Sequence, residues 1–280
     1  MSAGVKLAGV IGWPVHQSLS PLMHTHWLKL HGIAGAYVPL PIKPEDFGRC
    51  VAVLPRMGFT GVNVTVPHKE AAYALASELD EDAAATGAVN TLVFADGKIK
   101  GLNTDGRGFM ASLAESLGAD AAKAGPVVVL GAGGAARGIV NALLRGGAPE
   151  IRLANRTKGR AEKLAGDFGA KVKVMEWGEW SRGFAGARLV VNTTSLGMTG
   201  KDRLDIALDG LPAEAAVADI VYNPLETELL RTAKARGHRI MGGLGMLMHQ
   251  AVPAFAAWFG VTPAVTPVLR AEMEKALGRG

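Results

Sequence analysis

The stretch Pro126–Ala136, PVVVLGAGGAA, decides the fold of this chain. Its first half is a continuous apolar run rich in valine, which is typical of a parallel strand buried on both faces. Its second half, Gly131-x-Gly133-x-x-Ala136, predicts a tight turn that leads into a helix. Gly131 permits the turn, Gly133 lets the backbone come close to a pyrophosphate, and Ala136 lets the helix pack on the strand. The glycines could also form a purely structural turn, but their place between a strand and a helix favours a dinucleotide-binding turn.

Further apolar strand patterns follow this turn and alternate with helical segments. They are Ile151–Ala154, Val172–Val174, Leu189–Asn192, Ala216–Asp219 and Arg239–Met241. Buried strands separated by helices are the pattern of a doubly wound α/β sheet. We therefore expect a Rossmann domain over residues 107–241, with a helix at Ala135–Leu144 directly after the glycine turn.

The residues before this domain predict a second α/β domain. Its expected strands are Val5–Ile11, Ala36–Leu40, Gly61–Val66, and a hairpin of Asn90–Phe94 and Lys98–Leu102 around Asp96-Gly97. Its expected helices are Ser20–His31, Glu45–Met57 and Lys69–Leu79, and a further helix at Gly108–Leu117 leads into the Rossmann domain. We expect Ser20 to be the N-cap of the first helix and Pro21 its first helical residue. The last helical segment, Met246–Phe259, is expected to return to the first domain, which then comprises residues 1–106 and 242–280.

Composition and charge narrow the class of protein. Of the 280 residues, 49% are hydrophobic and 20% are charged, which is ordinary for a globular protein. The sequence lacks an apolar run that could span a membrane and the pattern of a secretory signal, and its one cysteine, Cys50, cannot form an internal disulfide. We expect a cytoplasmic protein with no membrane partner. The net charge of +5 comes from scattered basic residues, so acidic small ligands explain it better than nucleic acid. The histidine spacings do not resemble a zinc site, and no metal is expected.

The segment after the second Rossmann strand indicates which dinucleotide binds. It reads Asn155-Arg156-Thr157-Lys158-Gly159-Arg160. Sites that prefer NAD usually place an aspartate or glutamate here to hold a ribose hydroxyl. This segment has no carboxylate, and a guanidinium can grip a 2′-phosphate through two parallel hydrogen bonds. Cations at a helix start also oppose the helix dipole, which a bound anion would relieve. A solvated helix start is the alternative, and we favour NADP as the cofactor.

Polar residues in the first domain cluster at or just beyond the ends of apolar strands. They are Ser18, Ser20, Asn63, Thr65, Lys69, Asn90 and Asp105. Each of them alone could be a helix cap or part of a plain turn. In open α/β sheets, however, ligands bind outside the carboxyl ends of the strands, so we expect these side chains to converge on one cleft.

With these motifs in place, the chain resembles the shikimate dehydrogenase family over essentially its whole length. The matching segments, in order, are Trp13–Pro21, Asn63–Lys69, Gly87–Leu92, Asn103–Phe109, Gly131–Gly138, Asn155–Arg160, Asn192–Met198, Asp219–Thr227 and Gly242–Gln250. The family reduces 3-dehydroshikimate to shikimate with NADPH in the biosynthesis of chorismate and the aromatic amino acids. The resemblance implies an NADP-dependent oxidoreductase that acts on a CH–OH group, and we expect a monomer or a homodimer.

The resemblance also implies roles for individual residues. The substrate contacts are Ser18 and Ser20 on the carboxylate, and Thr65, Lys69, Asn90, Asp105, Tyr222 and Gln250 on the ring hydroxyls, the carbonyl and the carboxylate edge. Lys69 and Asp105 are the catalytic pair. The cofactor contacts are Gly131, Ala132, Gly133, Gly134, Ala135, Asn155, Arg156, Thr157, Arg160, Ile220 and Gly243, with Thr194, Ser195 and Met246 nearby.

The chemistry of such a pair fits hydride transfer. When hydride reaches a carbonyl carbon, negative charge grows on the oxygen, and a positioned ammonium can neutralise it. Burial in a cleft lowers a lysine pKa whereas a neighbouring carboxylate raises it, and the sequence leaves open which effect prevails. Two other functions also stay open. A quinate/shikimate dehydrogenase could use NAD or accept quinate, although Asn155–Thr157 argues against NAD. A non-catalytic NADP-binding sensor could keep the fold, although the presence of both Lys69 and Asp105 argues against it.

Overall fold

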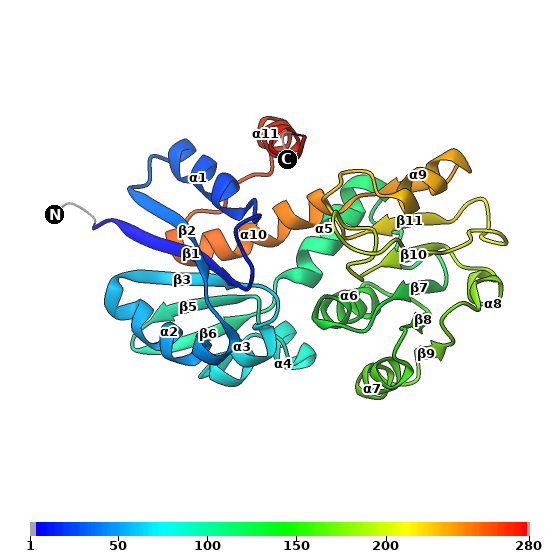
Figure 1. Ribbon diagram of the computed structural model, residues 1–280, viewed down its shortest axis with the longest axis horizontal. Coiled ribbons are helices and arrows are strands. Elements are labelled where there is room, and N and C mark those ends of the chain that lie inside the picture. Colours follow the sequence, from blue (N-terminus) through cyan, green and yellow to red (C-terminus); the bar gives the residue numbers. More distant parts are fainter. Residues whose placement is uncertain (1–3, 279–280) are drawn as a thin grey trace. The chain divides into compact units, whose positions relative to one another are not determined.

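The protein consists of two compact units, which the computed structural model describes over residues 4–278, apart from the side chain of Ser181. Residues up to Thr104 and from Gln250 onward form unit 1, and Asp105–His249 form unit 2 (Figure 1). The sequence placed the boundaries at 106 and 241 instead. The second boundary lies later because it falls inside one continuous helix, α10 (Gly243–Phe259), which begins in unit 2 and ends in unit 1. No helix among the described residues is long and apolar enough to cross a membrane.

Unit 2 is built on a parallel sheet with the order β12-β11-β10-β7-β8-β9. Its strands are β7 (Val127–Leu130), β8 (Ile151–Ala154), β9 (Val172–Met175), β10 (Leu189–Asn192), β11 (Ala216–Asp219) and β12 (Arg239–Met241). Its helices are α5 (Asp105–Leu117), α6 (Gly134–Arg145), α7 (Lys158–Phe168), α8 (Trp180–Phe184), α9 (Glu228–Ala235) and the start of α10. The chain runs outward from β7 to one edge and then from β10 to the other, which confirms the doubly wound Rossmann fold.

Helices cover both faces of this sheet because its strands are apolar on both sides. Val127 and Val129 lie in one buried cluster with side chains from α5, α6 and α7. Val128 and Leu130 lie in a second cluster with side chains from α8 and α9. Successive residues of a strand point to opposite faces, so an uninterrupted valine run supplies both cores at once. The same strand ends at Leu130, and the glycine turn begins at the next residue, Gly131.

Unit 1 contains a mixed sheet with the order β2-β1-β3-β5-β6-β4. Its strands are β1 (Lys6–Gly12), β2 (Gly35–Pro41), β3 (Phe59–Val64), β4 (Glu78–Leu79), β5 (Thr91–Ala95) and β6 (Lys98–Leu102). β1 is parallel to β2 and β3, whereas β5 is antiparallel to both β3 and β6. The hairpin between β5 and β6 turns at Asp96 and Gly97, which both have positive φ, as the Asp-Gly pair predicted.

The helices of unit 1 differ in several places from the sequence expectation. They are α1 (Ser20–Leu30), η1 (Pro44–Asp46), α2 (Phe47–Val53), η2 (Leu54–Met57), α3 (Lys69–Leu75), α4 (Glu81–Thr86), the end of α10, and α11 (Pro267–Leu277). The expected helix Lys69–Leu79 is wrong in its second half, because Glu78–Leu79 pair with β6 and Asp80 caps α4 by accepting the Ala83 N–H. The N-cap of α1 is Leu19 rather than Ser20, and the Ser18 Oγ accepts the Ser20 N–H at 3.3 Å.

The C-terminal half of α10 is attached to unit 1 through Trp258. The indole N–H of Trp258 donates to the Leu92 carbonyl at 3.0 Å. Gly61 in β3 makes this possible, because a Cβ at that position would lie 2.1 Å from the Trp258 indole nitrogen. The expected return of the last helix to the first domain is therefore confirmed, and a missing side chain in the sheet is what makes room for it.

Candidate functional site

The predicted polar residues of unit 1 gather at one edge of its sheet. β1 and β3 are parallel, so the segments after Gly12 and Val64 leave the sheet at the same edge. β5 runs in the opposite direction and pairs Thr91 with Asn63, which brings its first residues to that edge as well. β6 then returns to it, with Leu102 opposite Thr91. The sheet topology thus explains why residues far apart in the sequence meet here.

A network of amides and hydroxyls organises this edge around Asn90. The Asn90 Oδ1 accepts the Thr104 N–H at 2.9 Å and the Thr91 hydroxyl at 3.1 Å. The Asn90 Nδ2 donates to the Thr104 Oγ1 at 2.9 Å and to the Gln250 Oε1 at 3.3 Å. Two predicted substrate residues, Asn90 and Gln250, are therefore in direct contact. Thr91 and Thr104 were missed as members, although both follow an asparagine in the motifs Asn90-Thr91 and Asn103-Thr104.

The network continues through Asn63 to the predicted carboxylate site. The Asn63 Nδ2 donates to the Thr91 Oγ1 at 3.0 Å, and the Asn63 Oδ1 accepts the Tyr37 hydroxyl at 2.7 Å. Tyr37 also forms a hydrogen bond with Ser20, and burial raises its pKa well above the ordinary value. Tyr37 therefore connects a residue predicted to hold the carboxylate with the asparagine cluster. A tyrosine inside a strand gave no sequence signal for this role.

The ring of Tyr37 packs against a buried histidine, His24. The His24 ring stacks on the Tyr37 ring with centroids 4.0 Å apart and planes 2° apart. His24 is fully buried, and neither ring nitrogen has a hydrogen-bond partner among residues 4–278. Burial lowers the pKa of His24 to about 3, so the ring is neutral at physiological pH. His24 therefore contributes a neutral aromatic surface that packs against Tyr37 of the network.

Thr65 and Lys69 follow β3 at the same edge. The Thr65 N–H donates to the Ile11 carbonyl at 2.9 Å, and the Lys69 carbonyl accepts the Val89 N–H at 3.0 Å, directly beside Asn90. Gly12 lies against Thr65, because a Cβ on Gly12 would be 2.6 Å from the Thr65 methyl group. Lys69 is the first residue of α3, and its backbone lies next to the network through this hydrogen bond.

In unit 2 the glycine turn has the features that a dinucleotide requires. Gly131 has a φ of 105°, which only glycine adopts readily, and a Cβ there would lie 2.7 Å from the Thr193 Oγ1. Gly133 is exposed, and a Cβ on it would meet nothing within 4 Å among the described residues, which leaves its backbone open to a ligand. No side chain in this part of the structure caps α6, and the first turn of α6 holds no acidic residue. The start of α6 can therefore bind an anion.

The next strand ends in the segment that predicted NADP. The Asn155 Oδ1 accepts the Ala132 N–H at 3.2 Å, and its Nδ2 donates to the Thr157 carbonyl at 2.8 Å. Asn155 thus holds the glycine turn and the basic segment together. Arg156 and Arg160 are exposed, and neither forms an ion pair within residues 4–278. These observations fit a dinucleotide whose 2′-phosphate is gripped by arginine.

The remaining predicted residues of unit 2 lie at the same edge of its sheet. Ile220 follows β11 and donates its N–H to the Asn192 carbonyl at 3.1 Å. Gly243, the first residue of α10, lies directly on this segment, since a Cβ on it would be 2.1 Å from the Ile220 carbonyl oxygen. Tyr222 is half-buried, and burial raises its pKa. Thr194 and Ser195 follow β10, and Met246 is buried in α10.

The predicted catalytic pair is divided between the two units. Lys69 begins α3 in unit 1, whereas Asp105 is the first residue of α5 in unit 2. Asp105 is 5% exposed and lies in the first turn of its helix, where the helix dipole stabilises a negative charge. Ser18, Ser20, Thr65, Asn90 and Gln250 lie with Lys69 in unit 1, and Tyr222 and all predicted cofactor residues lie with Asp105 in unit 2.

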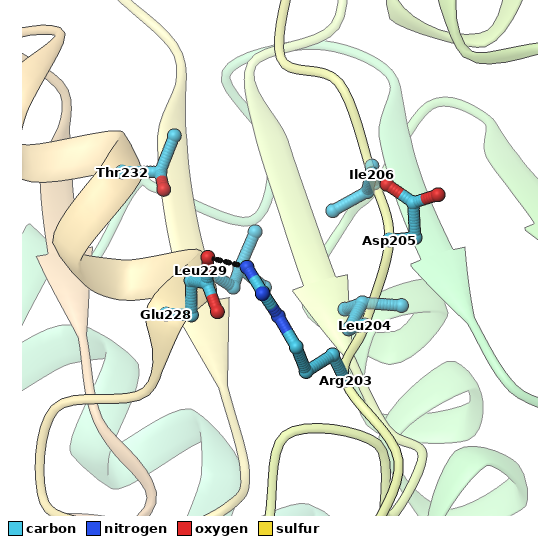
Figure 2. Close-up of a pocket in the computed structure, with 7 residues that line it drawn as sticks. All are labelled: Arg203, Leu204, Asp205, Ile206, Glu228, Leu229 and Thr232. Carbon is cyan, nitrogen blue, oxygen red and sulfur yellow. Dashed lines mark hydrogen bonds and ion pairs between the residues drawn. The ribbon is translucent and has the colours of Figure 1, made fainter.

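A pocket elsewhere in unit 2 contains none of the predicted site residues. It has a volume of about 440 Å³ and lies between the segment 203–206 and α9 (Figure 2). An ion pair between Arg203 and Glu228 spans it, and the Arg203 side chain is 78% exposed. Such an exposed ion pair is screened by water and contributes little to stability.

Comparison with known proteins assigns the family. Residues 10–92 match the model of the shikimate dehydrogenase substrate binding domain, residues 112–199 match shikimate / quinate 5-dehydrogenase, and residues 243–277 match the shikimate 5′-dehydrogenase C-terminal domain. A relative from Paramagnetospirillum magneticum named shikimate dehydrogenase (NADP(+)) is 53% identical over 272 residues, which are 97% of this chain and 99% of the relative.

Solved structures agree with this assignment. The shikimate 5-dehydrogenase from Thermus thermophilus in complex with NADP(H) and shikimate is 37% identical with a TM-score of 0.85, and the alignment covers 99% of both chains. A quinate dehydrogenase from Corynebacterium glutamicum in complex with NAD is 32% identical with a TM-score of 0.88 and covers 98% of this chain and 99% of that one. With its three matched segments and its relatives of the same length, the chain belongs to the shikimate dehydrogenase family.

Proposed function

We propose that this chain catalyses the reversible NADPH-dependent reduction of 3-dehydroshikimate to shikimate, with the residues predicted from the sequence in the roles described below. The observation that carries the cofactor assignment is the edge of unit 2, where the exposed backbone of Gly133 occurs together with the exposed arginines Arg156 and Arg160. Because this segment contains no carboxylate, its arginines attract a 2′-phosphate and no acidic side chain of the segment repels it.

The substrate end of the site is assigned to unit 1. Ser18 and Ser20 donate to the substrate carboxylate, since hydroxyl groups and backbone N–H groups are suitable donors. Asn90 and Gln250 bind ring hydroxyls, and their mutual hydrogen bond supports this role because it fixes the orientation of both amides. Thr65 completes the set, with Gly12 giving it room. The contribution of Tyr222 comes from unit 2.

Lys69 and Asp105 perform the proton chemistry. The bound cofactor supplies a hydride to the carbonyl carbon. As charge develops on the carbonyl oxygen, the Lys69 ammonium donates a proton to it, and in the oxidation direction the neutral amine takes the hydroxyl proton back. The Asp105 carboxylate accepts a hydrogen bond from a hydroxyl of the substrate ring.

The cofactor is held by residues at the edge of unit 2. The N-terminus of α6, from Gly133 to Ala135, receives the pyrophosphate. Arg156 and Arg160 bind the 2′-phosphate, with Asn155 and Thr157 beside them. Ile220 and Gly243 contact the nicotinamide end, and their close approach supports placing both in the same part of the cofactor site.

Kinetics of a lysine pair test the catalytic assignment. We expect Lys69→Ala to lower kcat by roughly 10²- to 10⁴-fold with the melting temperature unchanged, because a positioned acid or base contributes about this much. Lys29→Ala is the matched control, since Lys29 is an exposed lysine of the same unit at the end of α1. Ordinary turnover by Lys69→Ala would exclude the proposed role.

Turnover with shikimate and quinate, each with NADP and NAD, separates this proposal from its alternatives. A shikimate dehydrogenase of the proposed kind prefers shikimate with NADP. Equal use of quinate or of NAD would favour a quinate/shikimate dehydrogenase, and binding of NADP with no turnover of either acid would favour a sensor. The same preparation also allows the oligomeric state, proposed as monomer or homodimer, to be measured by light scattering.

A further inference from the structure

A buried carboxylate without an assigned role ends β11. Asp219 is 0% exposed, and the ion pairs among residues 4–278 do not include it. Its Oδ1 accepts the Asn192 Nδ2–H at 2.9 Å and the Val221 N–H at 3.0 Å. Its Oδ2 accepts the Thr227 hydroxyl at 2.7 Å. Its hydrogen-bond partners within the described residues are all neutral, and none of the ion pairs there offsets the buried charge.

The three partners of Asp219 belong to three different segments. Asn192 is the last residue of β10 and lies opposite Asp219 in the register of the two strands. Val221 lies in the loop that follows β11. Thr227 is the N-cap of α9, where it also accepts the Leu230 N–H. One carboxylate thus fixes the ends of two neighbouring strands and the start of the next helix.

The hydrogen bonds continue from Asn192 into the loop after β10. The Asn192 Oδ1 accepts the Thr194 N–H at 3.0 Å and the Thr194 hydroxyl at 2.7 Å. The Thr194 Oγ1 in turn accepts the Leu196 N–H at 3.0 Å. Farther out, the Thr199 hydroxyl donates to the Asn223 Oδ1 at 3.0 Å and the Thr199 N–H to the Asn223 carbonyl at 2.9 Å. The segments 192–199 and 219–223 are therefore connected at both their inner and outer ends.

These two segments carry one end of the proposed cofactor site. Thr194, Ser195 and Ile220 all lie on them, whereas the phosphate and adenosine contacts lie on the segments after β7 and β8. The two ends of the cofactor are thus assigned to different strands of the sheet, and Asp219 hydrogen-bonds to the segments of only one end.

We propose that Asp219 is a positioning residue that fixes the two loops on which the nicotinamide end of the cofactor rests. This inference depends on the proposed function, because it takes the nicotinamide contacts from it. The cost of the arrangement supports it: burial raises the pKa of Asp219 to about 6 against its three hydrogen bonds, so the carboxylate opposes folding at neutral pH. A group that costs stability and orders a ligand-binding edge is of the kind found at functional sites.

Binding of two ligands of different length tests the proposal. NADPH spans the whole site, whereas 2′,5′-ADP reaches only the adenosine and phosphate contacts. We expect Asp219→Ala and Asn192→Ala to raise the Kd of NADPH about tenfold and to leave the Kd of 2′,5′-ADP within about twofold, since the adenosine contacts lie on other strands. In steady state, kcat falls by roughly 10²-fold, because a displacement of about 1 Å of a reacting group costs that much.

The conservative variant Asp219→Asn tests whether Asp219 positions the two loops or only supports the fold of unit 2. Its amide oxygen can still accept from Asn192 and Val221, and its Nδ2 faces the Thr227 hydroxyl. We expect it to restore both the Kd of NADPH and kcat to within about threefold of the wild type, as expected when hydrogen-bond geometry rather than charge matters. If Asp219→Ala is insoluble, Asn192→Ala gives the same comparison.

Two outcomes overturn the inference. One is an equal increase in the Kd of both ligands, which would mean a general structural role. The other is no change in either Kd or in kcat, which would mean that the loops hold their places without Asp219. Failure of the wild type itself to bind NADPH would instead refute the proposed function, so the two failures are distinguishable.

Discussion

The substitution Asp219→Asn removes a buried carboxyl group whose titration makes the free energy of unfolding of unit 2 depend on pH. The pKa of Asp219 is raised from 3.8 to about 6, chiefly by burial. Between these two values the folded chain holds a proton that the unfolded chain has lost. The free energy of unfolding therefore falls as the pH rises from about 4 to about 6, in total by about 3 kcal/mol at 1.36 kcal/mol per pH unit. Above pH 6 this loss is complete.

The asparagine variant has no such loss. It keeps the shape and hydrogen bonds of the protonated acid, so its free energy of unfolding at pH 8 should exceed that of the wild type by up to about 3 kcal/mol. At pH 5 the wild type is partly protonated when folded and has regained about 1.4 kcal/mol, so the advantage of the variant shrinks by that amount. The variant is thus expected to gain stability at high pH while keeping function.

Urea unfolding at pH 5 and pH 8, followed by tryptophan fluorescence, measures this difference. Trp177 and Trp180 lie in the same unit as Asp219 and form an edge-to-face pair with centroids 5.1 Å apart, so their emission reports on this unit. Asp209→Asn is the matched control, because the Asp209 side chain is 77% exposed and pairs only at the surface with Arg236. A stability difference between Asp219→Asn and wild type that is the same at both pH values would refute the reasoning.

Four further predictions concern single positions. Gly133→Ala should fold normally, because its methyl group enters open space, yet raise the KM for NADPH about tenfold by blocking the pyrophosphate. Gly131→Ala should instead lose about 1–3 kcal/mol in thermal unfolding, because its positive φ and the nearby Thr193 Oγ1 exclude a Cβ. Arg156→Ala should lower kcat/KM with NADP by about 10- to 100-fold and leave the value with NAD unchanged; parallel losses would contradict a 2′-phosphate contact. His24→Phe should match or exceed wild-type stability by about 1 kcal/mol in chemical denaturation, since it removes two unpartnered nitrogens; a clear loss would show that they are satisfied.

The strands of unit 2 could be predicted from the sequence almost to the residue. β8, β10, β11 and β12 begin and end where their apolar runs predicted. Strands covered on both faces are mostly apolar, so burial marks most of their length in the sequence. The glycines then locate the turn after β7 because they meet a backbone requirement that other residues do not meet.

Short elements held by distant partners were not predictable. β4 has two residues and exists because it pairs with β6, about twenty residues later in the chain. The helical pattern of Lys69–Leu79 therefore extended past the true end of α3. α11 was also missed, although Thr266 caps it by accepting the Leu269 N–H and Pro267 follows in the first turn. Caps and prolines indicate a helix start only once a helix is expected there.

The site residues divide in the same way, into residues within sequence motifs and residues that hold those motifs in place. Residues such as Asn90 and Asn155 were identified because they stand in contiguous motifs at strand ends. Tyr37 gave no such signal, and the motif Asp219–Thr227 did not reveal the role of its first residue. Both roles depend on strand register, because Asp219 faces Asn192 and Tyr37 reaches Asn63 from the next strand but one. Register is set by packing of the whole sheet, and a single sequence does not reveal it.

The two supporting networks differ in how they respond to pH. The network around Asn90 consists of amides and hydroxyls, its one phenol, Tyr37, has a pKa raised well above 10, and the adjoining His24 has a pKa of about 3. It therefore keeps one hydrogen-bond pattern from pH 5 to pH 9. The network around Asp219 changes its charge near pH 6. The free energy of unfolding of unit 2 should therefore change between pH 5 and pH 7. This change should be absent in Asp219→Asn, which has no carboxyl group to titrate.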